Sequence, residues 1–108
     1  MKKLENDFTR GKREFHSLFK NERINVYQVT MTYSTNEKDI FIEVFKPKIC
    51  KADIYHTDSY EKYPKDNEFG KRAWTITTMG SLNKILKNEF QLSNEEINEI
   101  SQICNNVF

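Results

Sequence analysis

The spacing of apolar residues changes along the chain, and the first pattern is typical of a helix. In residues 4–20 the apolar positions are separated by 4, 7, 3 and 1 residues, as on one helix face. Gly11 lies inside this pattern, where it costs about 1 kcal/mol relative to alanine. We therefore expect an N-terminal helix that is firm over residues 12–20. Its apolar face consists of Leu4, Phe8, Phe15, Leu18 and Phe19.

The next segments are rich in β-branched and aromatic residues, which predicts strands. Residues 24–33 alternate, and residues 40–45 are apolar on both faces apart from Glu43. The second of these strands is therefore expected to be central and covered on both sides. A further strand is expected at residues 71–78, where Trp74 and Ile76 share the buried side. Residues 51–55 are a candidate for a short additional strand.

After Gly80 the period returns to that of a helix, with apolar residues 3, 1 and 4 positions apart. These are Leu82, Ile85, Leu86 and Phe90. A last helix is predicted after Ser93, because Ser93 and Glu96 have the spacing of a capping box. Leu92 and Ile97 add the hydrophobic staple of the same helix start. Its buried stripe is predicted to contain Ile97, Ile100, Ile103, Cys104 and Val107.

These elements predict one domain over residues 1–108 with an α+β fold. We expect a small antiparallel sheet of three to four strands, with the N-terminal helix and the two C-terminal helices packed on it. A chain of 108 residues is long enough to bury one core.

The charge balance does not favour nucleic acid or lipid as a partner of the whole surface. The formal net charge is +1. No apolar run approaches the ~18 residues that span a bilayer, and no signal sequence follows the first lysines. We therefore expect a cytoplasmic protein without membrane association, in which Cys50 and Cys104 are reduced thiols.

Residues that could carry chemistry are few, so no catalytic residue, metal site or cofactor is predicted. Cys50, Asp53, His56 and Asp58 have no spacing typical of a zinc site. The three glycines are isolated, which excludes a glycine-rich phosphate loop. A small enzyme using Cys50 and His56 remains an alternative, because a thiol and an imidazole can form a nucleophile and base pair.

The densest aromatic stretch is residues 60–74, which combine four aromatic rings with cations. Trp74 is assigned to the core by strand alternation, whereas the loop before Gly70 is expected to contact a partner. Large rings and arginine are typical of protein interfaces. The predicted interaction residues are Tyr60, Tyr63, Lys65, Phe69, Lys71 and Arg72.

A second candidate surface is the polar face of the predicted N-terminal helix. Residues 1–25 carry seven Lys or Arg and four Asp or Glu, which makes this the most basic region. The basic face is predicted to contain Arg10, Lys12, Arg13 and Lys20. Cations interleaved with aromatic rings also occur in modules that bind single-stranded nucleic acid, and this is the alternative function.

Residues 60–74 have the pattern Y-x-x-Y-P-x-D-x-x-F-G-x-x-A-W. This pattern, with the strand at residues 41–46, resembles small uncharacterised proteins of phages, plasmids and conjugative elements of Firmicutes and Bacteroidetes. The resemblance covers roughly residues 24–90 and implies an accessory protein of a mobile element. It leads us to expect a non-enzymatic protein that binds a host or phage protein, with inhibition of a defence system such as CRISPR as one form of that role.

Overall fold

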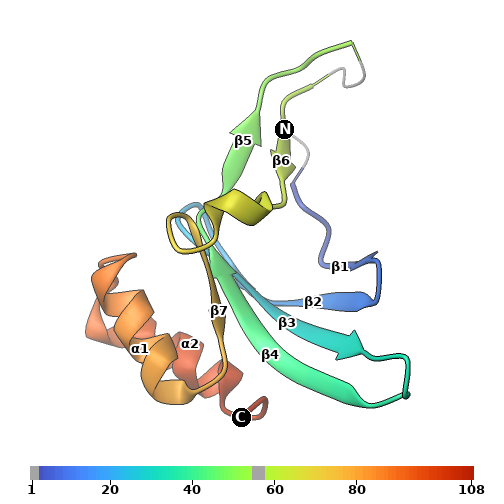
Figure 1. Ribbon diagram of the computed structural model, residues 1–108. Helices are drawn as coiled ribbons and strands as arrows, with labels where there is room; N and C mark the ends of the chain where they lie inside the picture. The colour runs from blue at the N-terminus through green and yellow to red at the C-terminus, as the bar shows by residue number, and fades with distance from the viewer. Residues whose placement is uncertain (1–2, 55–57) are drawn as a thin grey trace.

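The computed structural model describes residues 3–54 and 58–108. In this part the chain forms seven strands, a short 3₁₀ turn η1 (Asp66–Glu68) and two helices, shown in Figure 1. The helices are α1 (Met79–Asn88) and α2 (Asn94–Cys104). The strands are β1 (Asp7–Arg10), β2 (Arg13–Lys20), β3 (Asn25–Thr32), β4 (Lys38–Phe45), β5 (Lys48–Cys50), β6 (Tyr60–Lys62) and β7 (Ala73–Ile76).

Five of these strands make one sheet in the order β1-β2-β3-β4-β7, and every pairing in it is antiparallel. β5 and β6 pair only with each other in the described residues. The predicted fold is therefore wrong: the sheet is larger than three to four strands, and residues 4–20, predicted as a helix, contain strands β1 and β2 and no helix. Of the predicted short strand at residues 51–55, residues 51–54 form no strand and contain only an isolated bridge at Asp53, whereas β5 ends at Cys50.

The segment predicted as an N-terminal helix is the β1–β2 hairpin. Phe8 and Phe15 are cross-strand partners, and their rings stack with centroids 4.5 Å apart. Arg10 pairs with Arg13 across the turn, where Gly11 has a φ of +62°. Glycine adopts this left-handed conformation at little cost, so the residue that appeared to weaken a helix instead permits a tight turn.

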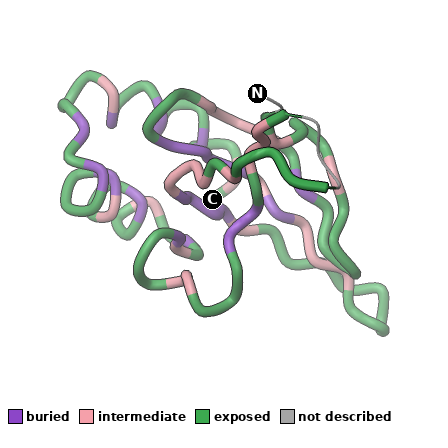
Figure 2. Tube along the Cα trace, turned by 90° about the horizontal axis from the view of Figure 1, so that it is seen from above, coloured by how far each residue is buried: buried purple, intermediate pink, exposed green. Residues whose placement is uncertain are grey.

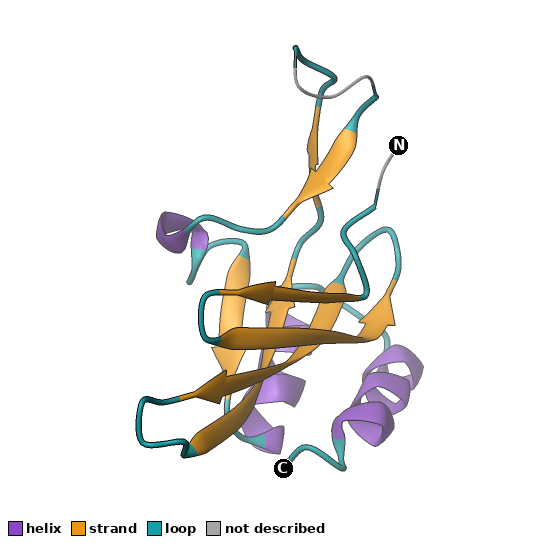
Figure 3. Cartoon of the chain, turned by 90° about the vertical axis from the view of Figure 1, so that its right-hand side faces the viewer, coloured by secondary structure: helices purple, strands orange, loops and turns teal. Residues whose placement is uncertain are grey.

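The two helices cover one face of the five-stranded sheet, as Figure 3 shows. Buried aliphatic residues of β3, β4 and β7 meet the inner faces of the helices here. This confirms the predicted helix stripe for Leu82 and Leu86, and Trp74 packs half-buried against the same core. The core residues with the lowest exposure on this face are Ile24, Val26, Ile42, Val44, Leu82, Leu86, Ile100 and Cys104.

The predicted start of the last helix is confirmed in detail. Glu96 N donates to Ser93 Oγ at 3.2 Å, and Ser93 N donates to Glu96 Oε1 at 3.1 Å. Both staple residues, Leu92 and Ile97, are buried in the core. Thr78 caps α1 by accepting from Ser81 N. Local sequence therefore specifies where both helices begin.

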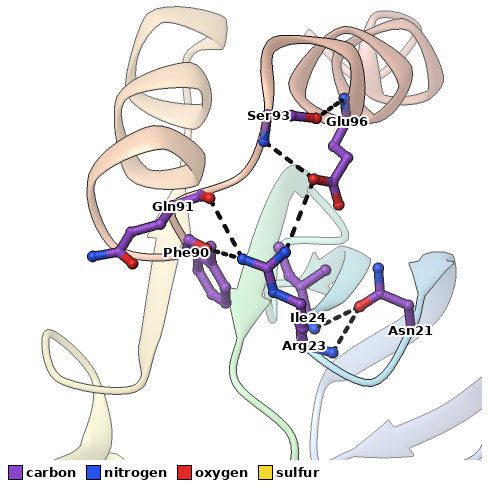
Figure 4. A network of polar contacts seen from close by, with 7 residues as sticks. All are labelled: Asn21, Arg23, Ile24, Phe90, Gln91, Ser93 and Glu96. Carbon is purple, nitrogen blue, oxygen red and sulfur yellow. Dashed lines mark hydrogen bonds and ion pairs between the residues drawn. The ribbon is translucent and has the colours of Figure 1, made fainter.

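Arg23 holds the β2–β3 turn against the connection between the helices (Figure 4). Its Nη2 donates to Phe90 O at 2.7 Å, and its Nη1 lies 3.9 Å from Glu96 Oε1. Asn21 Oδ1 accepts from the main-chain N–H of Arg23 and of Ile24. The Arg23 contacts to Phe90 and Glu96 join residues about seventy positions apart, so they fix the helices relative to the sheet.

The opposite face of the sheet is covered by aromatic residues rather than by helices. Tyr63 lies at the centre of this aromatic cluster and has ring contacts to Phe8, Phe15, Phe45 and Phe69. Tyr63 lies in the loop between β6 and η1, so this loop covers part of the aromatic face of the sheet. The buried members of the aromatic cluster are Phe15, Tyr27, Val29, Phe45, Tyr63 and Ala73.

β5 and β6 form an arm that projects away from the helices in Figure 1. The radius of gyration is 14.5 Å, whereas a compact chain of this length is expected to have about 13 Å. Figure 2 shows buried positions in the middle of the molecule and exposed ones toward its projecting ends. Ile49 on the arm is 50% exposed and Ile54 beyond it is 89% exposed, so the arm presents apolar side chains to solvent.

Candidate functional site

A hollow of about 320 Å³ lies between β1 and β6, and we call it the β1–β6 groove. The groove residues used below are Leu4, Phe8, Arg10, Tyr60, Lys62 and Tyr63. β1 is an edge strand of the sheet, and β6 pairs only with β5 in the described residues. The groove therefore joins aromatic and charged side chains to two strand edges, and its size is near the lower end of small-ligand sites.

The groove is backed by a buried carboxyl group. Glu43 on β4 is fully buried, and the Tyr63 hydroxyl donates to its Oε1. Its other oxygen, Oε2, accepts no hydrogen bond from the described residues. Burial raises the pKa of Glu43, while the Tyr63 hydrogen bond and Arg13 oppose that shift. Burial followed by the hydrogen bond to Glu43 likewise raises the pKa of Tyr63.

Two arginines of the β1–β2 hairpin reach this pair from the surface. The Arg10 guanidinium carbon lies 4.7 Å from the centroid of the Tyr63 ring. Arg13 Nη1 lies 3.9 Å from Glu43 Oε2, which is an ion pair but too long for a hydrogen bond. The hairpin turn therefore places two cations over one buried carboxyl group and its tyrosine.

Residues 3–6 form a strap along the groove, held through main-chain atoms. Leu4 N donates to Glu61 Oε1 at 2.8 Å, and Lys20 Nζ donates to Leu4 O. Tyr27 OH donates to Glu5 O at 2.6 Å. Burial lowers the pKa of Lys20, although Glu61 opposes this shift. These buried side chains bind the backbone of the strap, so the strap is a fixed wall of the groove.

The structure brings together residues that the sequence assigned to two separate surfaces. Tyr60 and Tyr63, from the aromatic stretch, line the same groove as Arg10 from the basic face. Tyr60 is half-buried, whereas Tyr63 is only 8% exposed and belongs mainly to the core. The sequence did not identify Phe8 or Glu43 as site residues. For Phe8, the available signal was that Phe8 and Phe15 lie on either side of Gly11, as expected for two strands joined by a tight turn.

The other predicted interaction residues lie outside the groove lining. Phe69 is half-buried against the aromatic cluster, and Lys65 and Lys71 are exposed. Arg72 Nη2 donates to Pro47 O at 3.0 Å, and its Nε lies 3.7 Å from Glu68 Oε2. Arg72 therefore supports the base of the arm.

The predicted basic helix face does not exist, because its residues lie on a hairpin. Arg10 and Arg13 contact Tyr63 and Glu43, and Lys20 lies 3.9 Å from Glu61 Oε1. Lys12 is exposed in the turn. Since three of these four cations have acidic or aromatic partners in the molecule, they do not form the continuous positive track that a nucleic-acid backbone requires.

The alternative enzyme depends on Cys50 and His56, and only Cys50 lies in the described residues. Cys50 on β5 is opposite Tyr60 in the register, and His56 lies outside the described residues. Residues 3–54 and 58–108 contain no group of three or more side chains that could hold a metal ion. Within the same ranges, no helix has the length and apolar content needed to cross a membrane.

Comparison of the chain with protein-family models, with curated proteins and with solved structures finds no match.

Proposed function

We propose that the protein acts without catalysis, by binding an extended segment of another protein in the β1–β6 groove. The observation that carries this proposal is the groove itself, where aromatic rings and Arg10 lie between two strand edges. An extended segment can add to a strand edge through main-chain hydrogen bonds, while its side chains enter neighbouring hollows.

The arm extends the same surface. Tyr60 and Lys62 belong to both the arm and the groove, and Ile49 on the paired strand is half-exposed. A two-stranded arm has little stability of its own, so apolar side chains on it favour a partner that covers them. A protein partner supplies such a cover, whereas a small ligand would leave the arm exposed.

The most specific form of the proposal is that the protein belongs to a mobile element and inhibits a host defence system such as CRISPR. This form depends only on the resemblance described above, which covers roughly residues 24–90. It is tested by adding the purified protein to a reconstituted CRISPR nuclease and measuring target cleavage. Inhibition that Tyr60→Ala abolishes would support it, and unchanged cleavage at saturating protein would contradict it for that nuclease.

Capture from host lysate with matched variants tests the general proposal. Tyr60→Ala and Lys62→Ala change the groove, whereas Tyr33→Ala and Lys84→Ala change the same residue types elsewhere. We expect the groove variants to lose the captured protein and the control variants to retain it. Equal capture by all four variants would contradict the proposal.

A nucleic-acid titration provides the counter-test. Fluorescence anisotropy with a single-stranded oligonucleotide is expected to show no binding that survives moderate salt, because the net charge is only +1 and three of the four cations of the β1–β2 hairpin contact acidic or aromatic side chains. Tight binding with a steep salt dependence would instead identify the protein as a nucleic-acid-binding module.

A further inference from the structure

We propose that Arg10 and Arg13 form a carboxylate-binding site that receives an aspartate or glutamate side chain of the protein partner. This inference depends on the proposed function, since it names the chemistry of the partner's anchoring residue. The site lies at the end of the β1–β6 groove, where Arg10 is part of the lining.

The two side chains are held in position before any partner binds. Arg10 and Arg13 are cross-strand partners on either side of a two-residue turn, so they are neighbours on the same face of the hairpin. Arg10 lies over the Tyr63 ring, and Arg13 lies beside Glu43. Because Tyr63 and Glu43 are buried and joined by a hydrogen bond, they provide a fixed base for both guanidinium groups.

The hydrogen-bonding capacity of both arginines is largely unused. The distance of 3.9 Å between Arg13 Nη1 and Glu43 Oε2 is longer than that of a hydrogen bond. The Arg10 guanidinium lies over the face of the Tyr63 ring. Within residues 3–54 and 58–108, neither guanidinium donates a hydrogen bond to another residue. Planar N–H groups therefore remain for an incoming acceptor.

The local charge favours one further anion. Like charges that face each other across a hairpin repel, and Arg10 and Arg13 share the single carboxyl group of Glu43. When Glu43 is ionised, this group of three side chains retains one positive charge. A carboxylate placed between the two guanidinium groups balances that charge and accepts N–H bonds from both.

A side-chain carboxylate fits this site better than a nucleic-acid backbone. A phosphate backbone needs a series of cations at regular spacing, whereas the lining of the adjoining groove places Glu5 and Glu61 among its lysines and aromatic rings. A peptide can place one acidic side chain on the arginines and a neighbouring apolar side chain against Phe8 and Tyr60. Arginine and tyrosine are also the residues most enriched among interface hot spots.

Binding of a defined acidic peptide tests the inference without knowledge of the partner. The probe is an N-acetylated, C-amidated hexaglutamate, titrated at low salt while the arginine Nε–Hε signals are recorded by NMR. We expect the Arg10 and Arg13 signals to shift and saturate together. Arg10→Gln with Arg13→Gln is expected to weaken binding at least about tenfold, the scale of one charge-assisted contact.

The control removes the same charge from neighbouring and distant exposed positions. Lys12→Gln with Lys71→Gln is expected to weaken binding by no more than about threefold, because general attraction between exposed charges is weak and screened. An equal loss in both double variants would overturn the inference. Inorganic phosphate that binds as tightly as the peptide would also overturn it, since the site would then select an oxyanion rather than a protein carboxylate.

A second double variant distinguishes loss of peptide binding from unfolding of the Arg10→Gln, Arg13→Gln protein. Arg10→Lys with Arg13→Lys keeps both charges, and we expect weaker peptide binding with wild-type thermal unfolding, because lysine lacks the planar N–H fork. Wild-type binding by this variant would contradict the inference. Capture from lysate that is lost in Tyr60→Ala but unchanged in the arginine variants would refute this inference and leave the proposed function standing.

Discussion

The hydroxyl group of Tyr63 donates to Glu43 Oε1 in the interior of the aromatic face. Tyr63→Phe removes this donor and keeps the ring that packs against Phe15 and Phe45. Oε2 of Glu43 already accepts no hydrogen bond in the described residues. After the substitution, both oxygens of a fully buried carboxyl group lack a hydrogen-bond donor there.

The expected loss follows from the cost of leaving a buried group without its partner. A hydrogen bond to a charged group contributes about 1.5–3 kcal/mol, so we take about 2 kcal/mol at neutral pH. An unfolding entropy of about 2.1 cal/mol/K per residue over 108 residues gives about 0.23 kcal/mol/K. The expected decrease in melting temperature is therefore about 9 °C.

The same reasoning predicts how the loss depends on pH. Burial raises the pKa of Glu43 and the Tyr63 bond lowers it, so Tyr63→Phe should raise this pKa further. A raised folded-state pKa gives stability that is complete below the ordinary value near 4.5 and is lost as pH rises through the folded-state value. The destabilisation by Tyr63→Phe should therefore be larger at pH 8 than at pH 4.5.

Urea unfolding of Tyr63→Phe at several pH values measures this effect, with Tyr27→Phe as the matched control. Tyr27 lies in the same aromatic cluster, but its hydroxyl donates to the neutral Glu5 carbonyl. Its loss is expected to be about 1 kcal/mol and nearly independent of pH. A double variant, Glu43→Leu with Tyr63→Phe, should approach or exceed wild-type stability. A loss for Tyr63→Phe that does not change with pH would refute the reasoning.

Three further predictions concern other parts of the fold. Arg23→Ala removes the donors to Phe90 O and is expected to cost about 1 kcal/mol in urea unfolding, whereas Glu22→Ala on the same turn should change little. Gly11→Ala places a Cβ at φ +62° and should destabilise the β1–β2 turn by about 1 kcal/mol, while Gly80→Ala in α1 should not. Burial raises the pKa of the Cys104 thiol to about 11. At pH 8 a thiol reagent should therefore modify Cys50 in the folded protein and Cys104 only after unfolding. Rapid modification of both thiols in the folded protein would contradict this burial.

The two helices and the strands β3, β4 and β7 were predictable because their signals are local. Ser93 and Glu96 satisfy each other's backbone groups within one helical turn, so their spacing alone locates the start of α2. The strands β3, β4 and β7 also follow from local composition, since each is rich in β-branched and aromatic residues. No distant contact is needed to recognise either kind of element.

The N-terminal hairpin was not predictable from spacing because the same positions fit two structures. Phe8 and Phe15 are seven residues apart, which matches two helical turns and equally a hairpin with its turn at Gly11 and Lys12. The hairpin is favoured because it buries Phe8 and Phe15 against Tyr27, Phe45 and Tyr63. These partners lie on later segments of the chain, so local spacing does not report them. Alternation of Phe15 with exposed neighbours in β2 was the weaker local signal.

The candidate site was predictable in its residue types and not in its arrangement. Tyr60 and Arg10 were identified on separate segments, and only the folded chain places them in one groove. Glu43 was noted as the polar exception in an apolar strand. Its hydrogen bond to Tyr63 depends on a contact between residues twenty positions apart, which no local pattern reports.

The location of the groove follows from how the two faces of the sheet are covered. The helices bury one face with mainly aliphatic side chains, and the polar contacts described there are the helix caps and the Arg23 network. The other face is covered by aromatic rings, a strap and a hairpin, and the hairpin residues Arg10 and Arg13 contact Tyr63 and Glu43 from the surface. Charged groups and strand edges therefore meet the surface at the aromatic face, and a partner that binds this protein gains most by adding the missing layer there.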